Sequence, residues 1–223
     1  MEMSIKLDKI CYIINHTCDC LKVKNMNSVT ISKEKEDLAQ ALKLPGCYDW
    51  QEFKTMQSLL QQQSNIRISY LDGVIELMTL GEKHETIKSM IAILLGIYFW
   101  QNRIEFIPVG SATRESEMQG VSFEPDESYY IGEKKENPDL AIEVNITSGS
   151  VKKLEKYKRF GIGEVWMWQE NKFYLYALEN NEYKQIFRSQ LLPDLNFKLL
   201  ENCVLMPSKL EAINTFTQGC DNK

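Results

Sequence analysis

The stretch PDLAIEVNI, residues 138–146, alternates apolar and polar side chains along its length. In an extended strand the even-numbered apolar residues share one face, so Asp139, Glu143 and Asn145 share the other. A carboxylate on so apolar a strand is costly to bury unless a cation, a hydrogen-bond donor or a metal ion pairs with it. We therefore predict a core strand whose polar face carries chemistry, with partners that come from other segments of the chain.

A hairpin and two helices are predicted upstream of this strand. Two alternating runs in IRISYLDGVIELM (66–78) flank Asp72-Gly73, a dipeptide that suits the positive φ angles of a tight hairpin turn. Amphipathic helices are predicted in DWQEFKTMQSLLQQ (49–62) and EKHETIKSMIAILLGIYFWQ (82–101). Thr79 and Glu82 have the spacing of a capping box at the start of the second helix.

The following segments predict an α/β core with a mixed sheet. Strands are predicted in RIEFIPVG (103–110), GVSFEPDESYYI (120–131), PDLAIEVNI and GEVWMW (163–168). A helix after Thr147-Ser148 is predicted to run to about Phe160, where Gly161 stops it. A carboxy-terminal hairpin is predicted in FYLYAL and EYKQIF. The order helix, strand, strand, strand, helix, strand is typical of α/β folds.

One domain with additions accounts for a chain of 223 residues. We predict an amino-terminal extension over residues 1–45, a domain over 46–205 and a tail over 206–223. No GxGxxG or GxxxxGK[ST] motif occurs, so we do not expect a Rossmann fold.

The charge and hydrophobicity of the chain exclude two classes of protein. A formal net charge of −5 is wrong for a protein that coats nucleic acid, because neutralising phosphates takes clustered Lys and Arg. Any contact with nucleic acid is therefore expected to be local. No apolar run reaches the roughly 18–20 residues of a membrane span, and the amino terminus does not read as a secretory leader. We expect a cytoplasmic protein with no membrane partner.

Two carboxylates are the first candidates for a functional site. Asp126, in FEPDESYYI, lies at the start of one predicted strand, and Glu143 lies inside the next. Neighbouring strands can bring Asp126 and Glu143 together. Such a pair, completed by waters and a phosphate oxygen, is a donor set that Mg²⁺ prefers. The same pair could instead supply the general acid and general base of a glycosidase.

A lysine on the following helix favours the first alternative. Lys153 lies at the margin of an apolar stripe formed by Leu154, Tyr157 and Phe160, so it can lean toward the sheet. A lysine beside a carboxylate-bound metal suits phosphodiester hydrolysis, where it orients the attacking water or stabilises charge on the phosphate. The other basic residues of this helix are predicted to face solvent: Lys152, Lys156 and Arg159.

Three further polar residues are candidates for accessory roles, namely His84, Asp139 and Asn145. His84 lies near the apolar stripe of its helix and could reach the carboxylates, although a histidine in such a place is more often a hydrogen-bonded core residue. Asp139 stands at the outer end of the Glu143 strand, where it either starts the strand or supports the site. Glu85 falls on the far side of the helical wheel from His84.

The chain resembles the PD-(D/E)XK nuclease superfamily and, within it, the Uma-type restriction endonuclease family. The resemblance covers about residues 45–200. It rests on YLDGVIELM, His84 near the start of the next helix, EPDESYYIG, PDLAIEVNITSGS and LEKYKRFGIGEVWMW.

The resemblance implies a restriction endonuclease-like αβββαβ core with a mixed sheet, plus an amino-terminal helix and hairpin and a carboxy-terminal hairpin. It also implies that Asp126 and Glu143 hold Mg²⁺ or Mn²⁺ and that the substrate is DNA. The superfamily pattern has a lysine two residues after the glutamate, where this chain has Asn145. In the Uma-type branch a lysine from the next helix takes that place, and Lys153 is the matching residue.

The sequence leaves two questions open, namely whether the site is catalytically active and whether the protein forms a homodimer. If Lys153 does not replace the missing lysine, the chain would be a catalytically inactive nuclease-like fold that binds a partner. Cleavage of both strands of a duplex needs two sites, which a homodimer would supply.

Overall fold

Two β-sheets and five helices make up the part of the chain that the computed structural model describes, which is residues 40–60, 66–145 and 153–221. Their bounds are β1 (Gln40–Lys43), α2 (Trp50–Leu60), β2 (Ile66–Leu71), β3 (Val74–Thr79), α3 (Glu82–Gln101), β4 (Phe106–Pro108), β5 (Arg114–Ser116), β6 (Val121–Phe123), β7 (Glu127–Ile131), β8 (Leu140–Asn145), α4 (Leu154–Lys158), β9 (Glu164–Gln169), β10 (Lys172–Glu179), β11 (Glu182–Ile186), α5 (Phe197–Leu205) and α6 (Lys209–Asp221).

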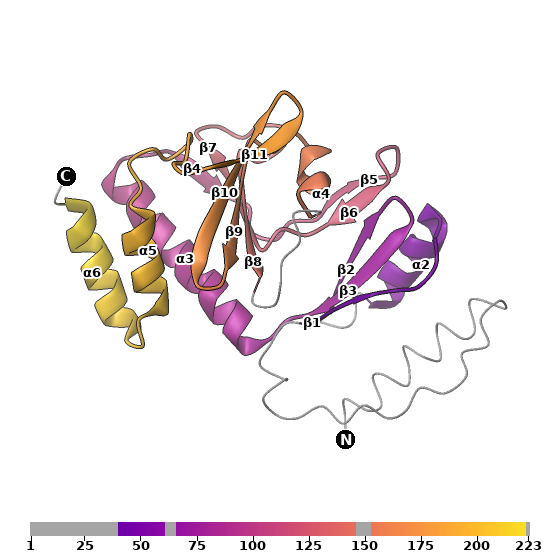
Figure 1. The fold of residues 1–223 in the computed structure, drawn as a ribbon, viewed down its shortest axis with the longest axis horizontal. Coiled ribbons are helices and arrows are strands. Elements are labelled where there is room, and N and C mark those ends of the chain that lie inside the picture. The colour runs from indigo at the N-terminus through magenta and orange to yellow at the C-terminus, as the bar shows by residue number, and fades with distance from the viewer. Residues whose placement is uncertain (1–39, 61–65, 146–152, 222–223) are drawn as a thin grey trace, which may run out of the picture. The chain divides into compact units, whose positions relative to one another are not determined.

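The larger sheet is mixed, and the smaller one is antiparallel in every described pair. The larger sheet has the strand order β11-β10-β9-β8-β7-β4, in which β8 and β9 run parallel and the other neighbours antiparallel. The smaller sheet has the order β1-β3-β2-β6-β5. Helices α3, α5 and α6 lie beside one another (Figure 1). The predicted α/β class with a mixed sheet is confirmed.

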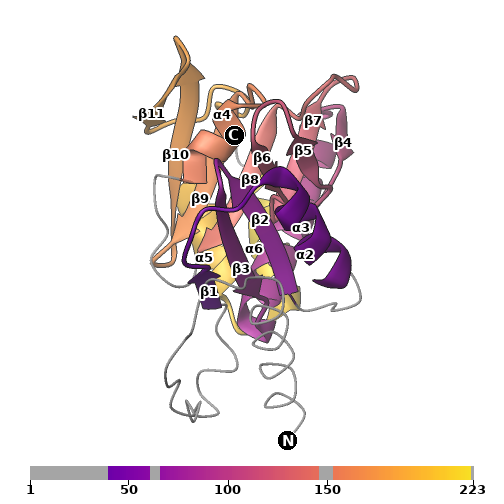
Figure 2. The same cartoon turned by 90° about the vertical axis from the view of Figure 1, so that its right-hand side faces the viewer.

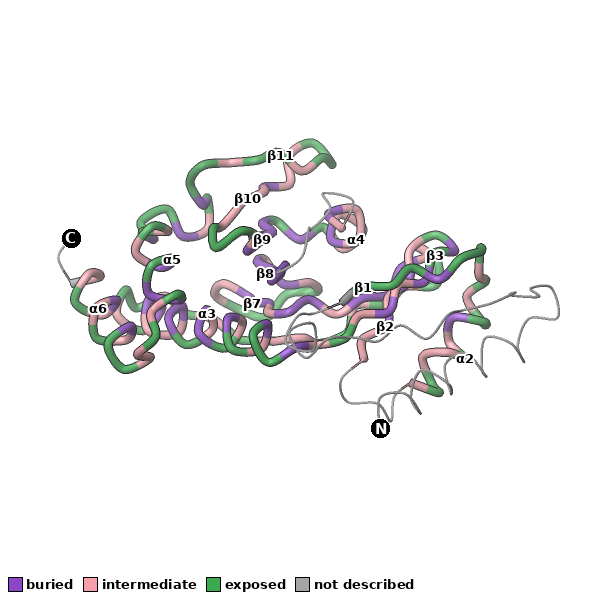
Figure 3. The backbone as a smooth tube through the Cα atoms, turned by 60° about the horizontal axis from the view of Figure 1, so that its bottom comes forward, coloured by how far each residue is buried: buried purple, intermediate pink, exposed green. Residues whose placement is uncertain are grey.

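Strand β8, which carries Glu143, is buried along its whole length (Figure 3). Its even-numbered residues pack in an apolar core with side chains of α3, α5 and α6. Ala141, on the other face, packs in a second core with Leu154 and Tyr157 of α4. The alternation predicted for the strand is therefore confirmed for residues 140–145, while Ile146 lies outside the described residues.

The predicted hairpin forms strands β2 and β3. Asp72 and Gly73 have φ angles of 48° and 86°, the left-handed values that the turn needs. Helix α2 lies against β2 (Figure 2) and packs Trp50 and Phe53 on Tyr70, with ring centroids 5.0–5.4 Å apart. Side chains alternate between the two faces of a strand. Because Tyr70 is buried under α2, its neighbours in β2 point to the opposite face.

Helix α3 spans the predicted residues but does not use the predicted cap. Its N-cap is Gly81, which makes no side-chain hydrogen bond to the helix. Thr79 is instead the last residue of β3, where it pairs with Ile66. The capping-box prediction is therefore wrong, because the strand ladder holds Thr79 and the helix begins only at Glu82.

The segment GVSFEPDESYYI, predicted as one strand, is divided between the two sheets. β6 belongs to the smaller sheet and β7 to the larger one. Between them stand Glu124, Pro125 and Asp126. Proline has no N–H to donate to a strand ladder, which accounts for the break at this point. Asp126 therefore lies where the chain passes from one sheet to the other.

Residues after β9 include the predicted hairpin and two helices. Asn180 and Asn181, both at positive φ, join β10 to β11 as predicted. Part of the predicted tail, residues 209–221, forms helix α6, whose Ala212 and Phe216 are buried in the core with α3 and α5. The division of the chain at residues 45 and 205 stays a prediction.

No helix among the described residues has both the length and the apolar character that crossing a membrane requires.

Glu164, at the start of β9, anchors a loop to the larger sheet. It is 1% exposed. Its carboxylate accepts hydrogen bonds from Trp166 Nε1, the Ser189 hydroxyl, and the backbone N–H groups of Gln190 and Leu191. The acid is therefore fully engaged in holding the 187–192 segment against the strand.

Replacing Glu164 with leucine should lower the free energy of unfolding by about 3 kcal/mol or more, because several buried donors lose their acceptor. Urea unfolding followed by circular dichroism measures the loss. The matched control is Glu182→Gln, an exposed acid of the neighbouring hairpin, for which we expect a change within about 0.5 kcal/mol. Equal stability of Glu164→Leu and the wild type would contradict the anchoring role.

Candidate functional site

Asp126 is buried and held by three donors from three other elements. Its Oδ1 accepts a hydrogen bond from Arg67 Nη1 of β2 at 2.6 Å. Its Oδ2 lies 3.1 Å from His84 Nε2 of α3 and accepts the Val144 N–H of β8 at 2.8 Å. Burial by itself would raise the pKa of Asp126, but His84, Arg67 and the Val144 N–H outweigh it and lower the pKa. The group is therefore held as a carboxylate.

Glu143 lies on β8, and Asp126 directly precedes the neighbouring strand β7. Strands β7 and β8 are antiparallel with Glu127 opposite Ile142, so Asp126 and Glu143 come at adjacent ends of the same ladder. The Tyr157 hydroxyl donates to Glu143 Oε1, and Lys153 Nζ lies 3.4 Å from Oε2. Both partners belong to the helical segment after β8. The structure thus brings Lys153 beside Glu143, while Asp126 falls opposite Glu143 in the register of the two strands.

Lys153 is held between Glu143 and the residue that follows it on the same strand face. Its Nζ donates to Asn145 Oδ1 at 2.9 Å. Burial lowers the pKa of Lys153, but the charges of Glu143 and Asp126 outweigh it and raise the pKa, so the ammonium stays charged. Asn145 is 5% exposed, and its Nδ2 has no hydrogen-bond partner in the described part of the chain. Asn145 thus anchors the lysine of the next helix.

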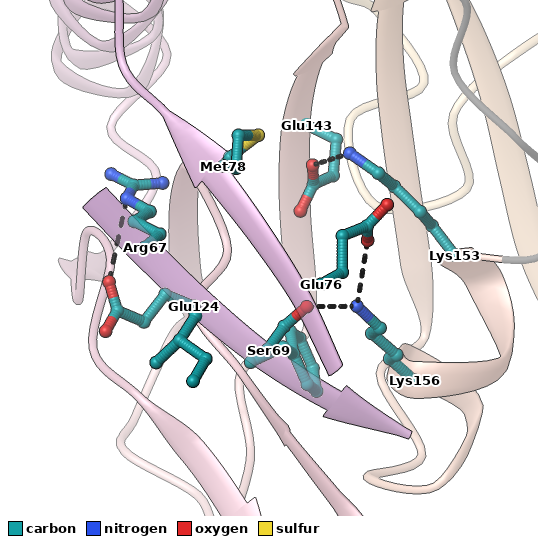
Figure 4. A pocket seen from close by; sticks show the side chains of 10 residues that line it. Arg67, Ser69, Glu76, Met78, Glu124, Glu143, Lys153 and Lys156 are labelled. Carbon is teal, nitrogen blue, oxygen red and sulfur yellow. Dashed lines mark hydrogen bonds and ion pairs between the residues drawn. The ribbon is translucent and has the colours of Figure 1, made fainter. Parts of the chain in front are cut away.

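A small cavity opens beside Glu143 and Lys153 (Figure 4). The centres of water molecules can occupy about 40 Å³ of it, which exceeds the roughly 10–15 Å³ that one water needs. The lining side chains come from the hairpin, the end of β6, β8 and α4. They are Arg67, Ile68, Ser69, Glu76, Met78, Phe123, Glu124, Glu143, Lys153 and Lys156. Asp126 is not one of them, although Arg67, which lines the cavity, donates a hydrogen bond to its Oδ1.

The predicted solvent-facing position of Lys156 is wrong. Its side chain is 12% exposed, and its Nζ donates to Ser69 Oγ at 2.7 Å. Arg159 is also engaged, because its guanidinium makes two hydrogen bonds to the carboxylate of Asp72 in the hairpin turn. The helical-wheel prediction that Lys156 and Arg159 face solvent failed because the polar face of the β2–β3 hairpin covers this side of α4. Lys152 lies outside the described residues.

His84 is a buried, hydrogen-bonded residue that contacts Asp126, and its accessory role stays a prediction. It is fully buried, and its Nδ1 lies 3.2 Å from Glu85 Oε1. Burial lowers the pKa of His84, but the hydrogen bond and charge of Asp126, and those of Glu85, outweigh it and raise the pKa. Because no surface of His84 is open, it can support Asp126 but cannot touch a substrate. Glu85 was predicted to lie on the far side of the wheel, and it nevertheless contacts the ring.

Asp139 is not brought to the site. Its Oδ2 accepts the Ile131 N–H at 2.8 Å and its Oδ1 lies 2.6 Å from Lys135 Nζ. These contacts tie the start of β8 to the loop after β7. Of the two roles weighed for Asp139, the structure supports strand entry.

Several residues of the site were missed from sequence, and the hairpin carried a signal for some of them. Arg67 pairs with Met78 across the hairpin, and Ser69 pairs with Glu76. Residues opposite each other share a face, so an arginine, a serine and a glutamate were set on one side of the hairpin by the alternation alone. Nothing local showed that this side faces β8.

The carboxylates retain capacity for a divalent cation. A carboxylate offers about four acceptor positions, of which Asp126 uses three and Glu143 two. The described residues contain no group of three His, Cys, Asp or Glu side chains placed to hold a metal. Mg²⁺ commonly takes only one or two carboxylates from a protein and completes its shell with waters and phosphate oxygens.

The raised pKa of His84 predicts a pH-dependent stability. A protonated His84 stabilises the fold fully below the unfolded-state pKa of 6.5, and this contribution is lost as pH rises through the higher folded-state pKa. In EDTA, the wild type should therefore lose stability as pH rises from 6 to 9, more steeply than His84→Gln. Urea unfolding at each pH measures both slopes, and identical slopes would contradict the charged His84–Asp126 pair.

Comparison with known proteins agrees with the resemblance described from sequence. The family model Uma2, described as "Putative restriction endonuclease", matches residues 50–204. No curated protein matches the chain. The matched range covers more than half of the 223 residues and contains Asp126, Glu143 and Lys153. The chain therefore belongs to the Uma2 family of putative restriction endonucleases.

Proposed function

We propose that this protein is a metal-dependent endonuclease that hydrolyses phosphodiester bonds in DNA. In this proposal Asp126 and Glu143 hold Mg²⁺ or Mn²⁺, and Lys153 acts on the phosphate. The elements α3, β4, β7, β8, α4 and β9 supply the restriction endonuclease-like αβββαβ core, with the hairpin strands β5 and β6 inserted between its first two strands.

The observation that carries the proposal is the position of the Lys153 ammonium. It lies 3.4 Å from Glu143 and 2.9 Å from Asn145, at the wall of a cavity, although it comes from a helix rather than from β8. A charged lysine and a carboxylate beside a water-sized space are the groups that phosphodiester hydrolysis needs.

Each residue has a distinct role in the proposed reaction. Lys153 stabilises the negative charge that grows on the phosphate, or orients the water that attacks it. Arg67 and His84 keep Asp126 ionised and fixed, and Asn145 fixes Lys153. A bound divalent ion would lower the pKa of a water and neutralise charge on the phosphate oxygens.

The proposed substrate contact is local. The chain is acidic overall, but Arg67, Lys153 and Lys156 place three cationic groups around one cavity. This distribution of positive charge agrees with a contact to only a few phosphates of the DNA. A homodimer that cuts both strands, and Mn²⁺ as a substitute for Mg²⁺, are parts of the same proposal.

DNA cleavage by the purified protein with Mg²⁺ or Mn²⁺ tests the function directly. We expect Asp126→Asn, Glu143→Gln and Lys153→Met each to lower the rate by about 100-fold or more, since each removes a group acting on the reacting phosphate or its metal. EDTA should abolish cleavage. The matched control is Asp139→Asn, which changes an acid before the same strand that the structure places away from the site, and which should stay within about threefold of the wild type.

A wild-type protein that cleaves no form of DNA with either metal, across salt and pH, would contradict the proposal. It would favour the alternative of an inactive nuclease-like fold that binds a partner. One observation supports that alternative, because every oxygen of the two acids already accepts a hydrogen bond or ion pair from the protein.

Moving the lysine provides an independent test of its role. Asn145 Oδ1 and Lys153 Nζ meet beside Glu143, so a lysine at residue 145 can place its ammonium in the same region. We expect Lys153→Met/Asn145→Lys to recover at least about tenfold of the activity that Lys153→Met loses. The control Lys153→Met/Asn145→Met should recover none. Equal DNA cleavage rates for the two double variants would show that Lys153 does not act through its positive charge beside Glu143.

A further inference from the structure

A second lysine of α4 faces the cavity from one helical turn beyond Lys153. Lys156 follows Lys153 by three residues, so both side chains leave the helix on the same side. Figure 4 shows Lys156 extending to Ser69 and Glu76 of the hairpin strands and Lys153 extending to Glu143 of β8, and both lysines line the cavity. Two ammonium groups therefore share the wall of one small cavity.

The hydrogen bonds of Lys156 leave donor capacity. An ammonium carries three donors. In the described part of the chain Lys156 donates to Ser69 Oγ at 2.7 Å, while Glu76 Oε2 lies at 3.6 Å, an ion-pair distance too long for a good hydrogen bond. At least one N–H of Lys156 can therefore donate a hydrogen bond to an oxygen of a ligand in the cavity.

The two lysines differ in how well the protein balances their charge. Lys153 is close to Glu143 and has a raised pKa. The pKa of Lys156 is lowered, first by burial and then by the charge of Lys153, which the carboxylates of Glu76 and Glu143 do not outweigh. An anion in the cavity would supply the compensation that Lys156 lacks.

We propose that Lys156 binds a phosphate group of the DNA strand beside the phosphate on which Lys153 acts. This inference rests on the proposed nuclease function. The contact reads no base, because phosphate contacts position a nucleic acid without reading its sequence. The contact between Lys156 and the phosphate contributes to substrate binding more than to the chemical step. Loss of this contact should therefore raise KM and leave kcat nearly unchanged. Glu76 competes with the phosphate for the same ammonium.

Steady-state cleavage of the DNA form that the wild type cuts tests this role. We expect Lys156→Gln to raise KM about tenfold or more with kcat within about threefold, the size expected for one charged hydrogen bond. Lys156→Arg keeps the charge and should keep KM within about threefold of the wild type. The matched control is Lys158→Gln, because Lys158 is on the same helix but pairs with Glu155 and does not line the cavity.

A second pair of variants keeps the inference testable if Lys156→Gln does not fold. Glu76→Gln removes the competing acid of Lys156 and should lower KM by about threefold or more. Glu124→Gln removes the same charge from the same cavity, but its partner is Arg67, so it should lower KM less.

The outcomes separate this inference from the function on which it rests. A wild type that cuts DNA while Lys156→Gln has unchanged KM would overturn the phosphate contact and leave the nuclease standing. A loss of kcat with unchanged KM would overturn it as well, since Lys156 would then act in the chemical step. Equal effects of Glu76→Gln and Glu124→Gln would count against it too. A wild type that cuts no DNA would overturn both proposals.

Discussion

The burial of two carboxylates within one ladder of strands is the constraint on which the rest of this structure depends. Asp126 is 1% exposed and Glu143 is 5% exposed. Burying such charges costs several kcal/mol each unless hydrogen bonds and opposite charges compensate. The compensation comes from three other elements, namely β2 with Arg67, α3 with His84, and the α4 segment with Lys153 and Tyr157. The acids therefore require the hairpin, the long helix and the short helix to converge on β8.

The two-sheet architecture follows from the same requirement. The chain leaves the smaller sheet at Pro125, and the next residue is the buried Asp126. Phe123, just before the break, packs on Tyr157 at a ring distance of 4.7 Å and so ties the smaller sheet to α4. This contact closes the cavity between the polar face of the hairpin and β8. If residues 120–131 formed one continuous strand, there would be no junction between the two sheets at Asp126, where Arg67 of the smaller sheet binds it.

The sequence was informative where a local pattern was strong. The alternation in 140–145, the Asp72-Gly73 turn and the apolar course of residues 82–101 each predicted an element that the structure contains. The pairing of Asp126 with the Glu143 strand followed from strand adjacency.

The sequence did not show which distant segment covers each face of a helix or strand. Lys156 was predicted to face solvent because a helical wheel contains no information about which distant segment covers it. The split at Pro125 was missed because both halves have strand character. Arg67 was missed because its partner Asp126 is 59 residues away in sequence. The residues that compensate the buried acids are set by tertiary contacts, which a local pattern does not contain.

The measurement that tests this account most directly is a crystal structure of the protein soaked in Mn²⁺, with anomalous scattering used to locate the metal. The account predicts a Mn²⁺ peak within roughly 2.0–2.6 Å of carboxylate oxygens of both Asp126 and Glu143, with Lys153 still beside Glu143. The peak should be absent in Glu143→Ala. A soaked wild-type crystal with no metal at these acids, or a peak that Glu143→Ala leaves unchanged, would contradict it.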